Sequence, residues 1–202
     1  MGRKKTYDRD TLIARSVELF RDHGYQGTST QMLVDGLEIN RYSLYAEFGS
    51  KQALFDAALE RYNDAVIGRS FGLLEAPGAG IAEVRALLEF YALANLSPAW
   101  GRGCLLCNTA VEFGPDDPSG AGFVQRYFER LSGAFQAALE NAHRGGELRA
   151  SVDGRQEADL LTAAVLGLFV MLRAKAPSTV IEGAAHAAIE HLEALRAQGP
   201  PR

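Results

Sequence analysis

Apolar residues recur at helical spacing along nearly the whole chain, whereas the alternation typical of strands is not sustained anywhere. The first such segment, residues 8–23, has Asp8 or Asp10 as its expected N-cap and Phe20 on its apolar face. Gly24 follows as a helix stop, because glycine enters positive-φ conformations at little cost. The pattern predicts an all-α protein of about nine helices.

Two short helices are predicted after this segment. Thr28 and Gln31 have the spacing of a capping box, which predicts a helix start there. Asn40 is the expected cap of the next helix, which runs to about Phe48 and is ended by Gly49. Three helices in fewer than fifty residues form a compact head.

A longer helix is expected to follow the head. Ser50 is its predicted cap, and its amphipathic pattern continues over residues 51–71. A linker at 75–80 then leads to a larger helical unit, with helices expected at about 81–96, 103–113, 118–143, 155–175 and 179–197. The predicted domains are therefore 1–50, with 51–71 as a connecting helix, and 72–202.

Composition indicates a soluble globular protein of 202 residues, with 47% hydrophobic and 23% charged residues. Two cysteines are too few for a disulfide framework, so we expect a reducing, cytoplasmic location. No signal peptide follows the basic N-terminus. The most apolar run, residues 163–172, is half of the ~20 residues that a spanning helix needs, so no membrane partner is expected.

Charge is divided unevenly along the chain, although the net charge is −4. Residues 1–51 hold eight Lys/Arg against seven Asp/Glu, whereas residues 52–202 hold thirteen against eighteen. A slightly basic head on an acidic body is compatible with a polyanionic partner that faces the head.

The segment beginning at Asn40 has the composition that major-groove reading requires. Leu44 and Phe48 share one face and would hold the helix rigidly, which leaves hydrogen-bonding side chains of the first turn exposed. Arg41 is suited to a bidentate contact with guanine, worth ~1–3 kcal/mol of discrimination. From pattern alone, a capped helical hairpin with no DNA partner is the alternative.

The motifs of this head closely resemble those of the TetR family of DNA-binding regulators. GYQGTS at 24–29 and LYAEFGSKQALF at 44–55 match the family's G-Y-x-x-T-S start, its L-Y-x-x-F recognition helix and its G-S-K-x-x-L-F opening of helix four. The resemblance covers about residues 8–60 and extends more loosely over the rest. It implies a ligand-responsive regulator, most often a repressor, which binds a palindromic double-stranded DNA operator as a homodimer.

The candidate DNA contacts combine phosphate donors near the helix starts with the first turn of the recognition helix. They are Lys4, Lys5, Thr28, Ser29, Thr30, Asn40, Arg41, Tyr42, Ser43, Tyr45 and Lys51. Two positions depart from the family pattern. Glu38 stands in the helix-turn-helix turn where glycine is usual, and Tyr42 stands where a small residue is common.

The last two predicted helices are the expected dimer interface, as in the family that the head resembles. The first is apolar nearly all round, and the second is rich in small residues that permit close helix approach. The candidate interface residues are Leu161, Val165, Leu168, Phe169, Leu172, Ile181, Ala185, Ala188 and Leu192. A monomer with a very apolar core is the alternative.

An unknown small-molecule inducer is the second expected partner, bound among the middle helices. Candidate ligand or sensor residues are Tyr62, Phe90, Tyr91, Trp100, Cys104, Cys107, Asn108, Tyr127 and Phe169, with Phe123 and Phe128 as further lining candidates. For any single one of them, core packing is the alternative interpretation. In relatives of the family, inducer binding changes the separation of the two heads and releases the operator.

Cys104 and Cys107 have the spacing of a Cys-x-x-Cys pair. The surrounding segment resembles a G-C-L-x-x-N segment of one branch of TetR-type regulators, in which some members sense oxidants through cysteine, so a thiol switch with Cys107 as resolving partner is one hypothesis. Two buried, inert thiols are the alternative. No second Cys/His pair lies nearby, so no metal site is expected.

A small helical redox enzyme using Cys104 and Cys107 is the alternative function, and a helical protein–protein adaptor is a third class. Thioredoxin-like chemistry is set in a βαβ context that the chain lacks, and neither a nucleotide loop nor a hydrolase or zinc-protease motif is present. We therefore expect no catalytic residues, no cofactor and no enzyme activity.

Overall fold

The computed structural model describes residues 7–93, 101–113 and 121–197, and these residues are helical apart from turns and one isolated antiparallel bridge between Leu148 and Arg196. The chain forms two compact units. The first comprises Met1–Val66 and Cys104–Val124, and the second comprises Ile67–Gly103 and Gln125–Arg202. This division interleaves the chain, whereas the domains predicted from sequence are continuous.

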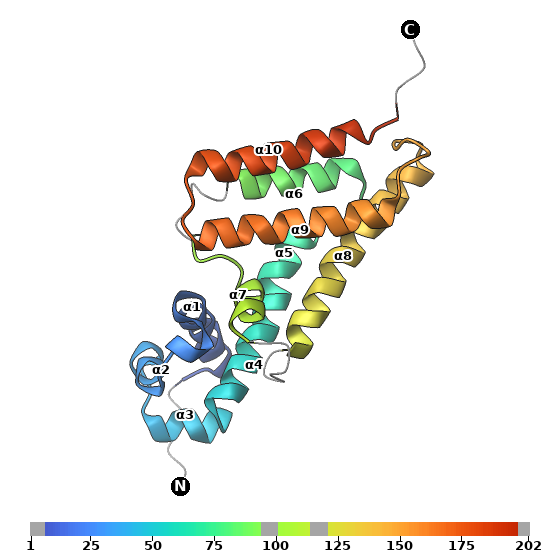
Figure 1. Ribbon diagram of the computed structural model, residues 1–202. Coiled ribbons are helices and arrows are strands. Elements are labelled where there is room, and N and C mark those ends of the chain that lie inside the picture. The colour runs from blue at the N-terminus through green and yellow to red at the C-terminus, as the bar shows by residue number, and fades with distance from the viewer. Residues whose placement is uncertain (1–6, 94–100, 114–120, 198–202) are drawn as a thin grey trace. The chain divides into compact units, whose positions relative to one another are not determined.

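The first unit is built on helices that pack around α1 (Figure 1). Its helices are α1 (Arg9–Gly27), α2 (Thr30–Leu37), α3 (Arg41–Phe48), α4 (Lys51–Tyr62) and α7 (Leu105–Glu112). α1 contacts α2, α4 and α7, and α3 lies against α2 and α4. The fully buried core of this unit includes Phe20, Leu33, Leu54 and Phe55.

Side-chain caps define the starts of the four helices α1 to α4. Asp8 accepts a hydrogen bond from the Thr11 amide, Asn40 accepts from the Ser43 amide, and Ser50 accepts from the Ala53 amide. Each such cap contributes about 1 kcal/mol to helix stability, because it satisfies an N–H group that the helix leaves open. The predicted caps Asp8, Asn40 and Ser50 are thus confirmed.

The start of α2 differs from the prediction by one residue. Ser29 is its N-cap and accepts from the Met32 amide, whereas the Thr28 hydroxyl donates to the carbonyl oxygen of Gly24. The capping box expected from Thr28 and Gln31 is therefore wrong, because tertiary burial draws Thr28 inward. α10 begins at Ser178, and Pro177 occupies its N-cap without a side-chain hydrogen bond.

The single helix expected over residues 51–71 is divided. α4 ends at Tyr62, a π-helical segment η1 follows at Asn63–Ile67, and α5 covers Gly68–Phe71. When these three segments are counted as the one predicted helix, the described residues contain about the number of helices that the sequence predicts.

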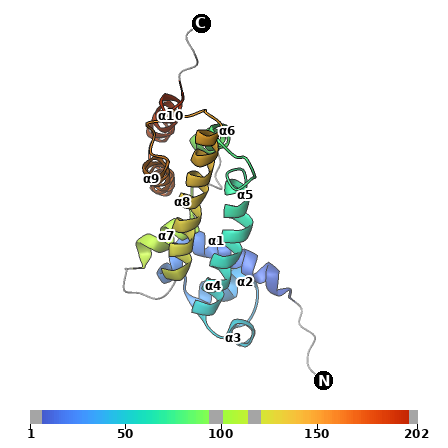
Figure 2. The same ribbon diagram turned by 90° about the vertical axis from the view of Figure 1, so that its right-hand side faces the viewer.

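The second unit is dominated by three helices that lie side by side, α6 (Ile81–Leu93), α9 (Gly154–Arg173) and α10 (Ser178–Ala194). Figure 1 shows them from the side, and Figure 2 shows α9 and α10 end-on. α8 spans Ala121–Arg144, so most of it belongs to this unit. Arg85 of α6 pairs with Glu193 of α10, and Arg130 of α8 pairs with Glu75. Among the described residues, no helix is long and apolar enough to cross a membrane.

Candidate nucleic-acid interface

α2 and α3 are joined by a tight turn that centres on a strained residue. Glu38 ends α2 in the left-handed conformation, with φ 57° and ψ 36°. This conformation costs a non-glycine residue free energy, because its Cβ approaches the following carbonyl oxygen. Glutamate therefore occupies a left-handed position of the kind that glycine adopts without this cost.

The apolar side of α3 is packed against the rest of the first unit. Leu44 and Phe48 are buried against the other helices of the first unit. At its C-terminal end, the Arg9 guanidinium lies 5.2 Å from the centroid of the Phe48 ring. Arg9 also lies 3.6 Å from the Glu47 carboxylate, which accepts a hydrogen bond from the Tyr7 hydroxyl. The N-terminal part of α1 thus fixes the far end of α3.

The opposite face of α3 is open to solvent. Tyr42 is 83% exposed and Tyr45 is 41% exposed, which is unusual for large aromatic side chains in a packed domain. Arg41 is also exposed, and it forms no hydrogen bond or ion pair with any residue that the structure describes. The first turn of α3 therefore presents a cation and an aromatic ring, and both are free to meet a partner.

Most of the candidate DNA contacts lie at or near the N-terminal ends of α2 and α3. Ser29, Asn40, Arg41, Tyr42 and Tyr45 are exposed, and Thr30 and Ser43 are half-buried. Lys4 and Lys5 lie outside the described residues.

Thr28 and Lys51 are placed differently from the rest. Thr28 is completely buried, so its hydroxyl is unavailable to a phosphate. The Lys51 ammonium lies 4.2 Å from the centroid of the Tyr25 ring, a cation–π contact that partly covers it. Burial lowers the pKa of Lys51, and the neighbouring Glu112 carboxylate opposes that shift.

The candidate ligand residues are divided between the two units. Tyr62, Cys104, Cys107 and Asn108 belong to the first, whereas Phe90, Tyr91, Tyr127 and Phe169 belong to the second. In the second unit, the rings of Tyr91 and Phe169 meet edge to face, with centroids 4.8 Å apart, and both are buried. Phe90 is 44% exposed and contacts Tyr91, and Trp100 lies outside the described residues.

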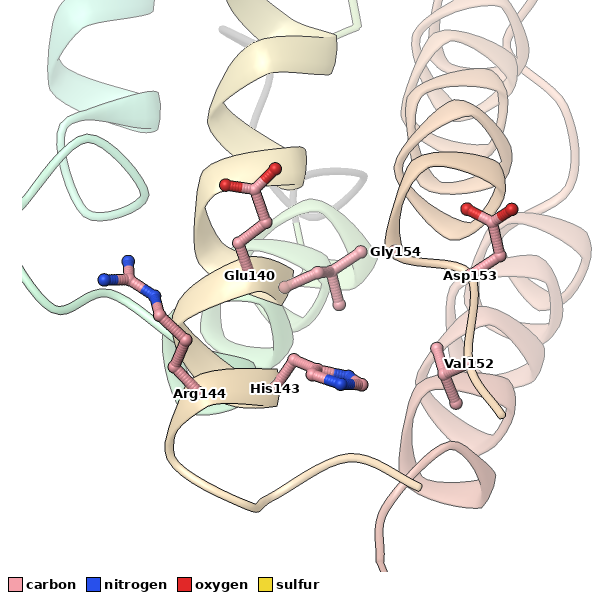
Figure 3. A pocket seen from close by; sticks show the side chains of 7 residues that line it. Glu140, His143, Arg144, Val152, Asp153 and Gly154 are labelled. Atoms are coloured by element: carbon pink, nitrogen blue, oxygen red, sulfur yellow. The ribbon is translucent and has the colours of Figure 1, made fainter. Parts of the chain in front are cut away.

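Two surface grooves are present elsewhere in the second unit, and neither is lined by these candidates. One, of about 430 Å³, lies where the end of α8 meets the start of α9 (Figure 3). His143 and Asp153 are among the side chains that line it, and Asp153 is engaged as the N-cap of α9. The other groove lies along α8 beside residues 74–78.

The cysteines are free and buried, with Cys104 wholly inaccessible. Cys104 is the N-cap of α7, and Cys107 is in its first turn. Burial, together with the neighbouring Cys104, raises the pKa of the Cys107 thiol to about 11, so at neutral pH this thiol is protonated and weakly nucleophilic. Tyr62 lies beside Cys104, and burial raises the pKa of its phenol well above the usual value. Among the described residues, no cluster suited to a metal ion is present.

The candidate dimer residues lie within the protomer's own core. Leu161, Val165, Leu168, Phe169, Leu172, Ile181, Ala185 and Leu192 are all buried, and Ala188 is half-buried. Next to them, each helix carries an apolar stripe whose members are exposed or half-buried in the part of the chain that the structure describes. The apolar stripe comprises Leu160, Ala163, Gly167 and Val170 on α9 and Val180, Gly183 and Ala187 on α10.

Glu112 was not among the candidates, yet its carboxylate reaches the head. It accepts hydrogen bonds from the backbone amides of Tyr25, at 2.8 Å, and of Gln26. The residue lies 86 positions beyond Gln26 in the chain, so no local pattern connects them.

A short helix with an exposed polar start, held rigidly across a tight turn from a second short helix, defines the chain as a helix-turn-helix DNA-binding protein. Residues 12–58 match the model of the bacterial regulatory proteins, tetR family, and residues 80–188 match that of the tetracyclin repressor-like C-terminal domain. The chain belongs to the TetR family of bacterial transcriptional regulators.

Relatives extend this similarity over most of the chain. The HTH-type transcriptional regulator YezE of Bacillus subtilis is 35% identical over 73% of this chain and 76% of its own length. The HTH-type transcriptional repressor ComR of Escherichia coli is 29% identical over 85% of this chain and 82% of its own. Among solved structures, a cysteine mutant of the TetR family regulator CifR, complexed with a 26-base-pair double-strand operator DNA, has a TM-score of 0.80. It is 28% identical and is matched over 93% of this chain and 98% of its own.

Proposed function

We propose that this chain is a ligand-responsive transcriptional repressor that binds a near-palindromic operator as a homodimer. The observation that carries the proposal is the exposed first turn of α3, whose far side is locked by Leu44, Phe48 and Glu47. Repressors among its relatives, ComR and the mycobacterial DhaR, support repression as the mode of action. We infer that the protein acts in the cytoplasm. We also infer that it is not an enzyme, because the two thiols that the alternative redox enzyme would use are both buried.

Within this proposal, Arg41 reads a base edge, and Tyr42 packs against an apolar group in the groove. Arg41 is exposed at the first residue of α3, where a guanidinium has the reach for the O6 and N7 atoms of guanine. Tyr42 offers a ring that is 83% exposed, which is suited to a thymine methyl group.

The remaining members of the interface position the protein without reading sequence. Ser29, Thr30, Ser43 and Tyr45 provide hydroxyl donors to phosphate, and Lys51 provides charge beside Tyr25. Thr28 takes no part, because its hydroxyl is engaged with the Gly24 carbonyl.

We propose that two protomers associate through the apolar stripe of α9 and α10. Leu160, Val170 and Val180 are each 50% exposed, an apolar surface that a stable monomer would leave in water. A Cβ atom added at Gly167 or Gly183 would meet no described residue within 4 Å apart from its own stretch of helix, so a partner helix has room to approach. The homodimer would present two α3 helices to major-groove faces roughly 34–36 Å apart.

Release of the operator follows from binding of a small molecule by the larger unit, where Tyr91 and Phe169 form an aromatic pair. A ligand shifts the equilibrium only by its preference for the state that does not bind DNA. Thiol modification as a second route would require Cys104 and Cys107 to become accessible first, because both are buried.

Selection of bound duplexes from a random pool tests the function directly. The purified dimer should enrich a sequence with two-fold symmetry and bind it at least 10³-fold more tightly than random DNA at physiological salt, on the order expected for specific recognition. A pool that stays random after repeated selection, with binding that disappears as salt is raised, would contradict the proposal.

A further inference from the structure

The C-terminal part of α1 contains a break that another helix fills. Gly24 has φ 72° and ψ 178°, which interrupts the helix and starts a fresh turn at Tyr25. Amide groups at the start of a helical turn lack intrahelical acceptors. The Glu112 carboxylate of α7 accepts from the first two of them, Tyr25 and Gln26.

The close approach of Glu112 depends on glycine at the break. A Cβ atom placed on Gly24 would lie 2.8 Å from the Glu112 Oε2 atom, nearer than real contacts allow. Glycine therefore suits this position in two ways: it adopts a positive φ at little cost, and it has no side chain to displace the Glu112 carboxylate. Gly24 and Glu112 form one arrangement, although they lie in helices distant in sequence.

The end of α7 extends this contact toward the start of α4. The Phe113 ring lies 5.3 Å from the Tyr25 ring and 5.9 Å from the Phe55 ring, measured between centroids. The Lys51 ammonium lies over the same Tyr25 ring. Tyr25 is therefore held by Glu112 through its backbone and by Phe113 through its ring, and it in turn supports Lys51.

Lys51 is the first residue of α4, and α3 ends at Phe48, three residues earlier. Only Gly49 and Ser50 separate Lys51 from the end of α3, so we expect a displacement of Lys51 to be passed on to α3. We propose that Glu112 is a positioning residue for operator recognition, which sets the α3 helix through Tyr25 and Lys51 from outside the helix-turn-helix. The inference rests on the proposed DNA-binding function.

The negative charge of Glu112 allows an electrostatic effect on DNA binding to be distinguished from a positioning effect. A carboxylate in the DNA-binding unit repels phosphates, so removing its charge should by itself strengthen DNA binding. If Glu112 positions α3, the same removal should weaken operator binding. The two effects have opposite signs, and the affinity decides between them.

The variant Glu112→Gln removes the charge and turns one acceptor into a donor, while its volume is kept. The matched control is Glu60→Gln, an exposed carboxylate on α4 that makes the same change in charge. Glu112→Asp keeps the charge but shortens the reach by one methylene. Operator affinity is measured by fluorescence anisotropy well below the melting temperature of each variant, with random duplex alongside.

We expect Glu112→Gln and Glu112→Asp to lose about tenfold or more in operator affinity, since charge-assisted hydrogen bonds to the backbone are lost. Random-duplex binding should stay unchanged or rise slightly. Glu60→Gln should bind the operator as the wild type does or slightly better. Amide hydrogen exchange at Tyr25 and Gln26 should accelerate in both Glu112 variants and not in the control.

Operator binding by Glu112→Gln that equals binding by Glu60→Gln, with Tyr25 and Gln26 still protected from exchange, would overturn the inference. The proposed function fails differently. In that case the wild type itself shows no preference for any operator, whereas the exchange experiment, which needs no DNA, still reports whether Glu112 holds the break in α1.

Discussion

The hydroxyl oxygens of Thr30 and Tyr45 lie 3.3 Å apart, which links the first residue of α2 to the exposed face of α3. Tyr45 is 41% exposed, whereas Leu44 and Phe48 of the same helix are buried. Two hydroxyl groups from different helices thus meet at the entrance to the proposed groove. Such a pair can hold one phosphate while the residues of the α3 first turn meet bases.

Arg41→Ala and Tyr45→Phe should separate base reading from phosphate contact. Loss of the Arg41 guanidinium should relax base preference at one operator position, at a cost of about 1–3 kcal/mol for the preferred base. Loss of the Tyr45 hydroxyl should weaken binding to all duplexes by a similar factor. Gel-shift titrations on the selected operator and on single-base variants measure both. Equal losses for Arg41→Ala on every duplex would show that Arg41 carries no sequence information.

Glu38→Gly should raise the free energy of unfolding by roughly 1 kcal/mol, because glycine adopts the left-handed conformation of Glu38 without the Cβ penalty. The ion pair that Glu38 makes with Arg15 is exposed, so its loss subtracts little. Urea unfolding of the purified protein provides the measurement. Asp35→Gly, in the exposed interior of α2, is the control and should destabilise by a comparable amount. If both variants destabilise, the backbone at Glu38 is not strained.

Ala163→Glu and Ala187→Glu should dissociate the homodimer. Each substitution places a charge on the apolar stripe, where it would be buried against the partner without a counter-charge. Analytical ultracentrifugation should show monomers at concentrations at which the wild type is dimeric, and operator affinity should fall with them. Ala82→Glu, on the exposed side of α6, is the matched control and should remain dimeric. Dimers that persist in both stripe variants would assign the interface to another surface.

Cys107 should react slowly with alkylating reagents in the folded protein. Burial favours its neutral thiol and raises its pKa from 9.0 to about 11. At pH 7.5 the thiolate is therefore about 100-fold scarcer than in an unstructured peptide, and the labelling rate should climb as pH rises toward 11. Iodoacetamide labelling followed by mass spectrometry checks this. Labelling of folded protein as fast as that of urea-unfolded protein would indicate an accessible, activated thiol and favour the thiol switch.

The raised pKa of the Cys107 thiol also predicts how the stability of the folded protein changes with pH. A folded-state pKa above the unfolded value means that the folded protein retains its proton longer. The contribution of this thiol to stability is therefore full below about pH 9 and is lost as pH rises toward 11. A Cys107→Ala variant should lack this decline.

The sequence by itself determined the features that depend on neighbours along the chain. Asp8, Asn40 and Ser50 could be assigned as caps because a capping side chain bonds an amide only three residues away. Gly49 was recognisable as a helix end for the same local reason. The helix-turn-helix and its exposed residues followed from these short-range rules, together with the spacing of the family motif.

Only the tertiary structure decided which side of an apolar helix faces inward. α9 is apolar nearly all round, so its periodicity could not separate Leu161 and Val165, which pack inside the protomer, from Leu160 and Ala163, which face outward. The role of Glu112 could not be predicted from the sequence, because its partners Tyr25 and Gln26 lie more than eighty residues away and only folding brings them close. Thr28 likewise stands at a position where a cap is expected from sequence, but it is buried and its hydroxyl donates to the Gly24 carbonyl oxygen. A helix cap depends on residues three positions apart, so the sequence can predict it. Burial depends on how all the helices pack together, so only the tertiary structure determines it.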